Sequence, residues 1–396
     1  MPSAVQPTSV YIHFPWCLQK CPYCDFVSYA KPRSDIDHKG YADAVLAELT
    51  SRANAFSGRE RPLRTVFFGG GTPSLWEAPE LGRVIEALRT TFGFEHDIEI
   101  TAECNPSSLD TERALALGHA GVNRLSIGVQ STDAAELKFL GRLHDGAGAI
   151  AALDAARSAG FARYSGDLIF GLPNQTAFEA EARVRDVLVA RPTHLSCYQL
   201  TIEPGTRFGE LAKVGRLPLA VDEHVAQAFL DLDTLLTAEG FTHYEISNYA
   251  KRGEESRHNL AYWHGETYLG LGCGAVGCLS DATANTAATA RVRYRNPTVP
   301  ERYMAAAHTL HESPEEQESL DAECILRERI MLGLRLRTGF DLEQAADELG
   351  VLAWPTSRRR AAETLAERAR LVLEGGRLRM SRDAWLFTDD TASRLF

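Results

Sequence analysis

Short apolar runs alternate with longer amphipathic stretches along the first 250 residues of the chain. Several of the short runs are apolar at consecutive positions, which is typical of strands that are covered on both faces. The longer stretches repeat apolar residues every three or four positions, which predicts helices packed against a sheet. The predicted strands cover residues 10–14, 65–68, 98–102, 124–129, 164–170, 194–200 and 242–246. The predicted helices cover residues 41–55, 79–91, 111–120, 148–159, 177–190 and 222–238.

This alternation predicts an α/β fold in which about six βα units form a parallel sheet with right-handed crossovers. A sheet of that kind that curves without full closure is a partial (β/α)6 barrel related to the TIM barrel. We therefore assign residues 1–250 to a partial barrel, residues 251–300 to a connecting segment and residues 301–396 to a C-terminal domain.

After residue 297 the pattern changes to consecutive helices, predicted at 301–311, 323–336, 341–348 and 355–370. Short strands are predicted at 371–373, 378–381 and 385–387, with two glycines at the hairpin turn. Helices followed by a hairpin indicate a winged-helix-like domain. The basic run at 358–360 shares its helix with acidic residues, so we expect a solvated face there rather than a nucleic-acid surface.

Polar or glycine residues follow several predicted strands at their carboxyl ends. They are Gly69, Gly70, Gly71, Thr72, Glu103, Gln130, Asp167, Tyr198 and Thr201. The carboxyl ends of parallel strands meet at one mouth of a barrel, which is where barrel active sites lie. Residues that are far apart in the sequence are therefore expected to line one pocket.

Three cysteines near the start of the chain, Cys17, Cys21 and Cys24, have the spacing C-x3-C-x2-C. Three thiolates on one short loop can bind three irons of a [4Fe–4S] cluster and leave the fourth iron open to a small-molecule ligand. The alternatives are a zinc knuckle and a redox pair formed by Cys21 and Cys24. Zinc is disfavoured because no second cysteine or histidine pair follows at zinc-ribbon spacing. The other five cysteines are expected to be buried apolar side chains.

Composition and charge narrow the classes of protein that the chain can represent. Its 396 residues are 44% hydrophobic and 24% charged, an ordinary composition for a globular protein. The net charge is −11 and the pI is near 5.6, which disfavours tight binding to nucleic acid. Residues 1–6 lack the pattern of a signal peptide, and no apolar run is long enough to span a bilayer. We therefore expect a cytoplasmic protein.

The cysteine loop resembles the signature of the radical S-adenosylmethionine (SAM) superfamily, C-x3-C-x-aromatic-C, with Tyr23 in the aromatic position. The resemblance implies a [4Fe–4S] cluster on Cys17, Cys21 and Cys24 whose open iron is chelated by the amino and carboxylate groups of SAM. The glycine run at 69–71 resembles the segment that binds the methionine amino group in that superfamily.

Longer stretches resemble a narrower group, the proteins related to oxygen-independent coproporphyrinogen III oxidase. The matching stretches are residues 11–15, 69–73, 102–106, 123–130 and 167–173. This resemblance implies SAM contacts at Tyr11, Gly70, Glu103 and Val276. The contacts that it implies for a second SAM are Tyr23, Gly71, Thr72, Gln130, Arg142, Asp167 and Thr201.

Two departures from the oxidase pattern point to its sister branch, the HemW family of haem chaperones. The oxidase has a further cysteine two positions after the third, where this chain has Phe26, and a long segment before the first cysteine, which here lies near the start. The sister branch also carries the motif H-N-x-x-Y-W, which is present at residues 258–263. The resemblance implies that His258 binds haem iron, with Tyr262 and Trp263 against the porphyrin, because imidazole is a common haem ligand.

The function expected from this branch is to bind haem and transfer it to acceptor apo-proteins. The cluster and SAM are the expected cofactors, and an electron donor such as flavodoxin or ferredoxin is an expected partner. One alternative is the oxidase reaction itself, oxidative decarboxylation of coproporphyrinogen III by radical hydrogen abstraction. A second is a radical-SAM enzyme that modifies tRNA, which the acidic pI and the lack of an added RNA-binding domain disfavour. We therefore expect no nucleic-acid partner and no membrane span.

Overall fold

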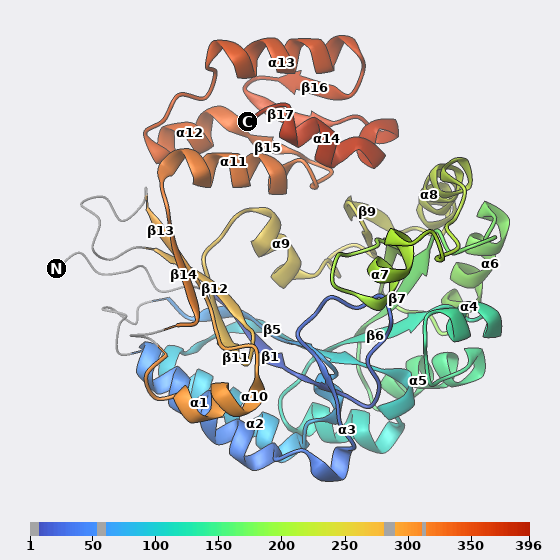
Figure 1. Ribbon diagram of the computed structural model, residues 1–396, viewed down its shortest axis with the longest axis vertical. Coiled ribbons are helices and arrows are strands. Elements are labelled where there is room, and N and C mark those ends of the chain that lie inside the picture. The colour runs from blue at the N-terminus through green and yellow to red at the C-terminus, as the bar shows by residue number, and fades with distance from the viewer. Residues whose placement is uncertain (1–7, 54–60, 281–289, 311–313) are drawn as a thin grey trace.

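The computed structural model describes residues 8–53, 61–280, 290–310 and 314–396, and a curved sheet forms its centre (Figure 1). The strands of this sheet are β1 (Ser9–Phe14), β4 (Leu63–Gly70), β5 (Phe94–Cys104), β6 (Arg124–Gln130), β7 (Arg163–Phe170), β8 (His194–Gln199), β9 (Thr242–Glu245), β10 (Asn248–Ala250), β11 (Tyr268–Gly272), β12 (Val276–Ser280), β13 (Arg291–Arg295) and β14 (Glu316–Leu320). Within the described ranges its order is β14-β13-β12-β11-β1-β4-β5-β6-β7-β8-β10-β9. The stretch β1-β4-β5-β6-β7-β8 is parallel throughout, which confirms the predicted parallel sheet of about six strands.

Helices cover the outer face of the parallel strands (Figure 1). They are α1 (His38–Ala53), α2 (Ala78–Phe92), α3 (Thr111–His119), α4 (Ala134–Phe139), α5 (Gly146–Ser158), α6 (Ala177–Leu188) and α8 (Asp222–Ala238). Each helix predicted for the barrel is present, while residues 54–55 of the first prediction lie outside the described residues. Within the described ranges, no helix combines the length and the apolar character that crossing a lipid bilayer requires.

The sheet continues past β1 into the predicted connecting segment at 251–300. β11 is parallel to β1, and β12, β13 and β14 follow in antiparallel order. The same segment begins with the short helix α9 (Arg257–Trp263), where the Ser256 side chain accepts a hydrogen bond from the Asn259 amide. Residues 251–300 therefore contribute strands to the main sheet, and the boundaries at 250 and 300 stay a prediction.

The C-terminal domain lies at the top of Figure 1, above the open side of the curved sheet. Its elements are α11 (Ala322–Gly333), β15 (Phe340–Asp341), α12 (Leu342–Leu349), α13 (Thr356–Glu367), β16 (Leu371–Glu374), β17 (Arg377–Met380) and α14 (Thr388–Ser393). The strands form a small sheet in the order β15-β17-β16, with helices packed on it. The predicted C-terminal helical, winged-helix-like domain is confirmed.

Two predicted elements near this end are wrong in type or length. Residues 385–387 belong to a 3-10 helix, Arg382–Phe387, because Trp385 turns inward and packs edge-on against His243 with 4.3 Å between ring centroids. The third strand of the small sheet is β15 instead. The helix predicted at 301–311 is α10 (Pro300–Ala306), and residue 311 lies outside the described residues.

Main-chain hydrogen bonds join the C-terminal domain to the last strands of the barrel. The Ile246 amide donates to the Arg335 carbonyl at 2.9 Å, and the Arg337 amide donates to the Tyr244 carbonyl at 3.1 Å. The Trp385 ring adds its contact with His243 of β9. These contacts fix the C-terminal domain beside the mouth of the barrel.

A buried carboxylate connects α1 to the far end of the sheet. Glu48 is fully buried and accepts hydrogen bonds from the Arg52 guanidinium at 2.7 Å, the Asn296 side chain at 2.8 Å and the Tyr303 hydroxyl at 2.8 Å. It also accepts from the Gly272 amide at 2.9 Å. A buried charge of this kind is stable only when its partners are present, because an unpaired buried charge is strongly unfavourable.

We expect Glu48→Ala to lower the free energy of unfolding by about 3 kcal/mol or more, because it leaves the Arg52 guanidinium buried without its partner. Asp43→Ala on the same helix is the matched control, since Asp43 pairs with Lys39 and Arg83 at the exposed surface. That control is expected to lose less than about 1 kcal/mol. Urea unfolding monitored by circular dichroism measures both variants, and equal losses would contradict the role assigned to Glu48.

Candidate functional site

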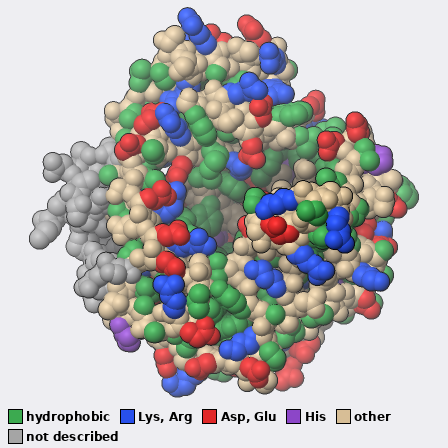
Figure 2. Space-filling model, viewed as in Figure 1, with side chains coloured by type: hydrophobic (Ala, Val, Ile, Leu, Met, Phe, Trp, Pro, Cys, Tyr) green, Lys and Arg blue, Asp and Glu red, His purple; other side chains and the backbone are tan. Residues whose placement is uncertain are grey.

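A cavity of about 770 Å³ opens where the parallel strands end, below the C-terminal domain. Figure 2 shows the surface hollowed between the C-terminal domain and the barrel, with hydrophobic side chains around the hollow. The predicted site residues that line this cavity are Tyr11, Cys17, Cys21, Tyr23, Cys24, Gly70, Gly71, Thr72, Glu103, Gln130, Arg142, Asp167, Thr201 and His258. Val276 lines a second cavity of about 680 Å³ instead, which shares Tyr11 and Tyr262 with the first. The predicted convergence of the strand ends therefore brings these residues together, whereas Gly69, Trp263 and Val276 lie outside the lining of the first cavity.

The cysteine loop is fixed by hydrogen bonds to two neighbouring elements, β1 and α7 (Arg207–Lys213). His13 of β1 donates from Nε2 to the Val27 carbonyl at 2.7 Å, and its Nδ1 accepts from the Tyr11 hydroxyl at 2.9 Å. The tautomer follows because a carbonyl can only accept, so Nε2 carries the proton. On the other side the Phe208 amide of α7 (Arg207–Lys213) donates to the Pro22 carbonyl at 2.9 Å. These contacts within the protein fix the loop to β1 and to α7 without a bound ligand.

The glycine turn after β4 lies directly against the segment that leads into the cysteine loop. The Gly71 amide donates to the Phe14 carbonyl at 2.7 Å, and the Thr72 amide donates to the Trp16 carbonyl at 2.8 Å. A Cβ at Gly71 would lie 2.6 Å from the Trp16 carbonyl oxygen, closer than real Cβ contacts. Gly70 has a φ of +107°, which favours glycine, and a Cβ there would lie 2.5 Å from the His13 ring. Only glycines allow this close approach.

The three cysteine side chains line the cavity. Burial raises the pKa of Cys17 to about 11, and burial also raises the pKa of Cys24. The Arg142 guanidinium donates to the Cys21 sulfur at 3.4 Å. The thiols of Cys17 and Cys24 therefore need a cationic partner to ionise, which iron supplies to a ligating thiolate. Across the described residues, no three His, Cys, Asp or Glu side chains gather as ligands of a single metal ion, and the cluster assignment stays a prediction.

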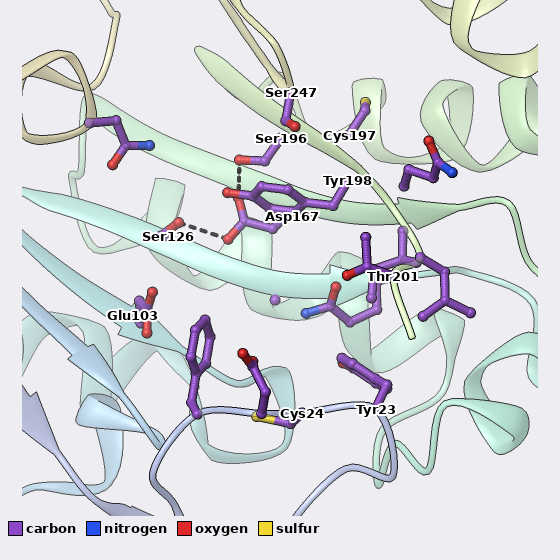
Figure 3. Close-up of a pocket in the computed structure, with 18 of the residues that line it drawn as sticks. Tyr23, Cys24, Glu103, Ser126, Asp167, Ser196, Cys197, Tyr198, Thr201 and Ser247 are labelled. Carbon is purple, nitrogen blue, oxygen red and sulfur yellow. Dashed lines mark hydrogen bonds between the residues drawn. The ribbon is translucent and has the colours of Figure 1, made fainter. Parts of the chain in front are cut away.

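Two acidic side chains, Glu103 of β5 and Asp167 of β7, lie inside the cavity on strands that flank β6 (Figure 3). Glu103 at the end of β5 accepts from the Gly70 amide at 3.1 Å, and burial together with the nearby Asp167 charge raises its pKa to about 8. Asp167 accepts hydrogen bonds from the hydroxyls of Ser126 at 2.7 Å and Ser196 at 2.7 Å. Glu103 is therefore mostly protonated at neutral pH, and an arriving ammonium group would favour its ionised form.

Gln130 ends β6, Arg142 lies between α4 and α5, and both residues line the cavity. Gln130 has a φ of +65°, unusual for a side-chain-bearing residue, at the point where the register of β6 on β7 shifts. The Arg142 guanidinium also donates to the Gly128 carbonyl at 2.9 Å, in addition to its contact with Cys21. Such local backbone strain is found where a side chain must be aimed at a ligand. The geometry suits the predicted contacts of both residues.

His258 on α9 lies in the wall of the same cavity and is 1% exposed. Its Nδ1 is 2.8 Å from the Thr65 hydroxyl, and its ring stacks on Phe67 with 5.0 Å between centroids. The Tyr262 ring contacts it edge-on at 4.9 Å. Burial lowers the pKa of His258 to about 4, so the imidazole is neutral, and within the described residues its Nε2 has no hydrogen-bond partner. A neutral imidazole with a free ring nitrogen at a cavity is the form that binds a metal.

Trp263, the last residue of the motif, does not share this position. Tyr262 is part of the cavity lining, whereas Trp263 lies outside that lining and has the Arg335 guanidinium 5.7 Å from its ring centroid. The two aromatic residues are consecutive on one helical turn, so they project from different sides of α9. Only Tyr262 is placed to contact a ligand in the cavity.

Several cavity residues were not predicted from the sequence. Ser126, Ser196 and His194 lie on the inner faces of β6 and β8, where polar residues recur at every second position. That two-residue period is a usable signal, because successive side chains of a strand point to opposite faces. Arg335 and Trp385 reach the cavity from the C-terminal domain, and no local pattern could have placed them there.

Comparisons with known proteins agree with this geometry. Residues 11–187 match the radical SAM superfamily, and residues 320–387 match the HemN C-terminal domain. The heme chaperone HemW of Escherichia coli (strain K12) is 40% identical over 298 residues, which are 75% of this chain and 77% of that protein. The heme chaperone HemW of Bacillus subtilis (strain 168) is 34% identical over 344 residues, 86% of this chain and 87% of that protein.

A solved structure has the same fold over the whole chain. Coproporphyrinogen III oxidase (HemN) from Escherichia coli, a radical SAM enzyme, has a TM-score of 0.80 and 21% sequence identity. The match covers 100% of this chain and 91% of that one. The fold and the cysteine-lined cavity define a radical SAM protein with a C-terminal domain of the HemN type. Within that class, the chain belongs to the HemW family.

We expect Gly71→Ala to reduce the iron and sulfide bound after anaerobic reconstitution by more than half, because its Cβ must displace the backbone that leads into Cys17. Gly82→Ala in α2 is the matched control, since a Cβ there meets atoms only at ordinary contact distances of 3.5 Å. Iron and sulfide analysis with a circular dichroism check of folding measures the effect. Full cluster content in a folded Gly71→Ala variant would contradict the close-approach argument.

The raised pKa of Glu103 predicts a pH dependence of stability in the protein without cofactors. The folded state keeps the Glu103 proton up to a pKa of about 8, whereas an unperturbed glutamate loses it near 4.5. The folded state therefore binds more protons between these values, and stability falls as the pH rises through them. Between about pH 5 and about pH 8 the wild type is expected to lose about 3 kcal/mol more than Glu103→Gln.

Denaturant unfolding at both pH values measures this difference. Glu86→Gln at the exposed surface of α2 is the control and is expected to follow the wild type. Parallel stability curves for the wild type and Glu103→Gln would show that Glu103 is ionised in the folded protein.

Proposed function

We propose that this chain binds haem and delivers it to acceptor apo-proteins, with a [4Fe–4S] cluster and SAM as its cofactors. Membership of the HemW family supports this proposal, because the relatives from Escherichia coli and Bacillus subtilis are named heme chaperones. The radical SAM domain supports the two cofactors. The observation that carries the haem assignment is the buried, neutral imidazole of His258, whose Nε2 lacks a partner among the described residues.

In this proposal Cys17, Cys21 and Cys24 bind three irons, and the fourth iron stays open for the amino and carboxylate groups of SAM. Glu103 and the Gly70 backbone lie on one side of the cysteine loop and would contact the methionine end of SAM. Tyr11 and the more distant Val276 would contact the rest of that cofactor. When bound, the cluster and SAM supply one-electron chemistry, and the protein supplies orientation and exclusion of water.

The residues predicted for a second SAM also line this cavity. They are Tyr23, Gly71, Thr72, Gln130, Arg142, Asp167 and Thr201. Arg142 and Asp167 carry opposite charges and would bind the carboxylate and ammonium groups of an amino-acid moiety. We propose this subsite for a second zwitterionic ligand, with one or two bound SAM as the alternatives.

The remaining assignments concern partners and location. We propose an electron donor such as flavodoxin or ferredoxin, because the cluster must receive an electron before it can react. We also propose a cytoplasmic protein without a nucleic-acid partner, in line with its net charge of −11. The oxidase reaction remains the competing function, and Phe26 in place of the oxidase's further cysteine argues against it.

Haem titration of the wild type and His258→Ala tests the proposal. The Soret band of haem is expected to shift when haem binds the wild type. With His258→Ala this shift is expected to be absent, and haem is expected to bind at least tenfold more weakly, a loss of about 1.4 kcal/mol in binding free energy. His264→Ala is the matched control, because His264 is the exposed residue that ends the same helix. Circular dichroism confirms that each variant is folded.

An unchanged Soret band in His258→Ala would remove His258 from the role of iron ligand. The competing functions are tested on the same wild-type preparation. Formation of protoporphyrinogen from coproporphyrinogen III under anaerobic reducing conditions with SAM would establish the oxidase reaction. Retention of bulk tRNA in a filter-binding assay at physiological salt would favour the RNA-modifying alternative.

A further inference from the structure

We infer that haem on His258 and SAM beside Glu103 exclude one another, so that SAM binding releases haem from this protein. The inference rests on the proposed function and adds a release mechanism to it. It is drawn from the positions of the two predicted contact sets within one cavity.

The first observation is that aromatic rings connect the two sites without a gap. Tyr11 stacks on Phe67 with 6.2 Å between centroids, and Phe67 stacks on His258 with 5.0 Å between centroids. All three rings line the cavity together with Glu103. Tyr11 also lies close to Glu103, since burial and then the Glu103 charge raise its pKa. The predicted SAM contacts and the predicted haem ligand are thus separated by the width of one phenyl ring.

The second observation is that the His258 ring cannot turn to present iron elsewhere. Its Nδ1 is occupied by the Thr65 hydroxyl at 2.8 Å, and its amide donates to the buried Glu99 carboxylate at 3.1 Å. The Phe67 and Tyr262 rings contact the imidazole on its face and at its edge. Iron can therefore approach only Nε2, the nitrogen that has no partner in the described part of the chain.

The geometry of haem then determines which space it fills. A porphyrin lies across the iron–nitrogen bond and extends on all sides of the iron, so it must cover the cavity wall around His258. That wall includes Phe67, Tyr11 and Tyr262, which also border the space in front of Glu103. Trp385 and Asp389 of the C-terminal domain line the same cavity.

This arrangement gives a release step that needs no covalent change. SAM, bound at the open iron and at Glu103, would occupy space that the porphyrin needs, and the two affinities would oppose each other by simple competition. Glu103 would set the strength of this competition, because it is a predicted SAM contact and His258 is the proposed iron ligand.

The experiment measures haem affinity at increasing SAM concentration, on anaerobically reconstituted protein without reductant, so that SAM stays intact. Soret absorbance reports haem, and equilibrium dialysis with labelled SAM reports the cofactor. At a SAM concentration of ten times its own dissociation constant, the apparent haem dissociation constant is expected to rise about 11-fold and to keep rising in proportion. In Glu103→Gln the same SAM concentration is expected to change haem affinity less than twofold, because dialysis is expected to show that this variant binds SAM more than tenfold more weakly.

Glu77→Gln serves as the matched control, since Glu77 is an exposed residue outside the cavity, and it should behave as the wild type. Haem affinity that stays constant, or reaches a plateau, while dialysis shows saturation with SAM would mean that both ligands bind together. That result would overturn the inference and leave the proposed function intact. Absence of any haem binding by the wild type would overturn the proposed function and the inference with it.

Discussion

The site depends on one backbone contact, the approach of the glycine turn after β4 to the end of β1. Because Gly70 and Gly71 have no Cβ, the turn lies directly against Phe14 and Trp16, and two amides donate to their carbonyls. The contact fixes the direction in which the chain enters the cysteine loop. It also leaves the Gly70 amide pointing at Glu103 on the next strand. The absence of a Cβ at Gly70 and Gly71 thus fixes the positions of the cysteine loop, the glycine turn and Glu103 relative to each other.

The interior of the barrel mouth is polar but contains few free charges. Glu103 is mostly protonated, His258 and His13 are neutral because burial lowers their pKa values to about 4, and the thiol of Cys17 is protonated. Each of these groups changes its state only when a ligand of opposite charge or a metal arrives. The cavity is therefore prepared for cationic ligands and metals.

Much of the fold could be predicted from the sequence, since local patterns carry it. Each predicted barrel strand and helix is present because the consecutive apolar runs of the strands and the 3.6-residue period of the helices are strong between 9 and 246. The strands β11–β14 were not predicted, because β13 alternates arginine with apolar residues and reads as a charged loop. Trp385 was assigned to a strand because residues 385–387 are three consecutive apolar residues. In the structure the Trp385 ring packs against the distant His243, and this contact favours a 3-10 helix instead.

Part of the candidate site could also be predicted from the sequence, because short motifs carry it. Motifs that resemble those of a known family located the cysteines, the glycine turn, Glu103 and His258, and these residues line the cavity. The hydroxyls around Asp167 and the wall from the C-terminal domain depend on pairing between distant segments, which local patterns do not encode.

The central claim is that His258 offers iron its Nε2 inside the cavity that also contains the cysteine loop. An anaerobic crystal structure of the protein with haem tests this most directly. The account predicts iron bonded to His258 Nε2, with the porphyrin lying over Phe67 and in front of Glu103. Haem bound outside this cavity, or to another residue, would contradict it.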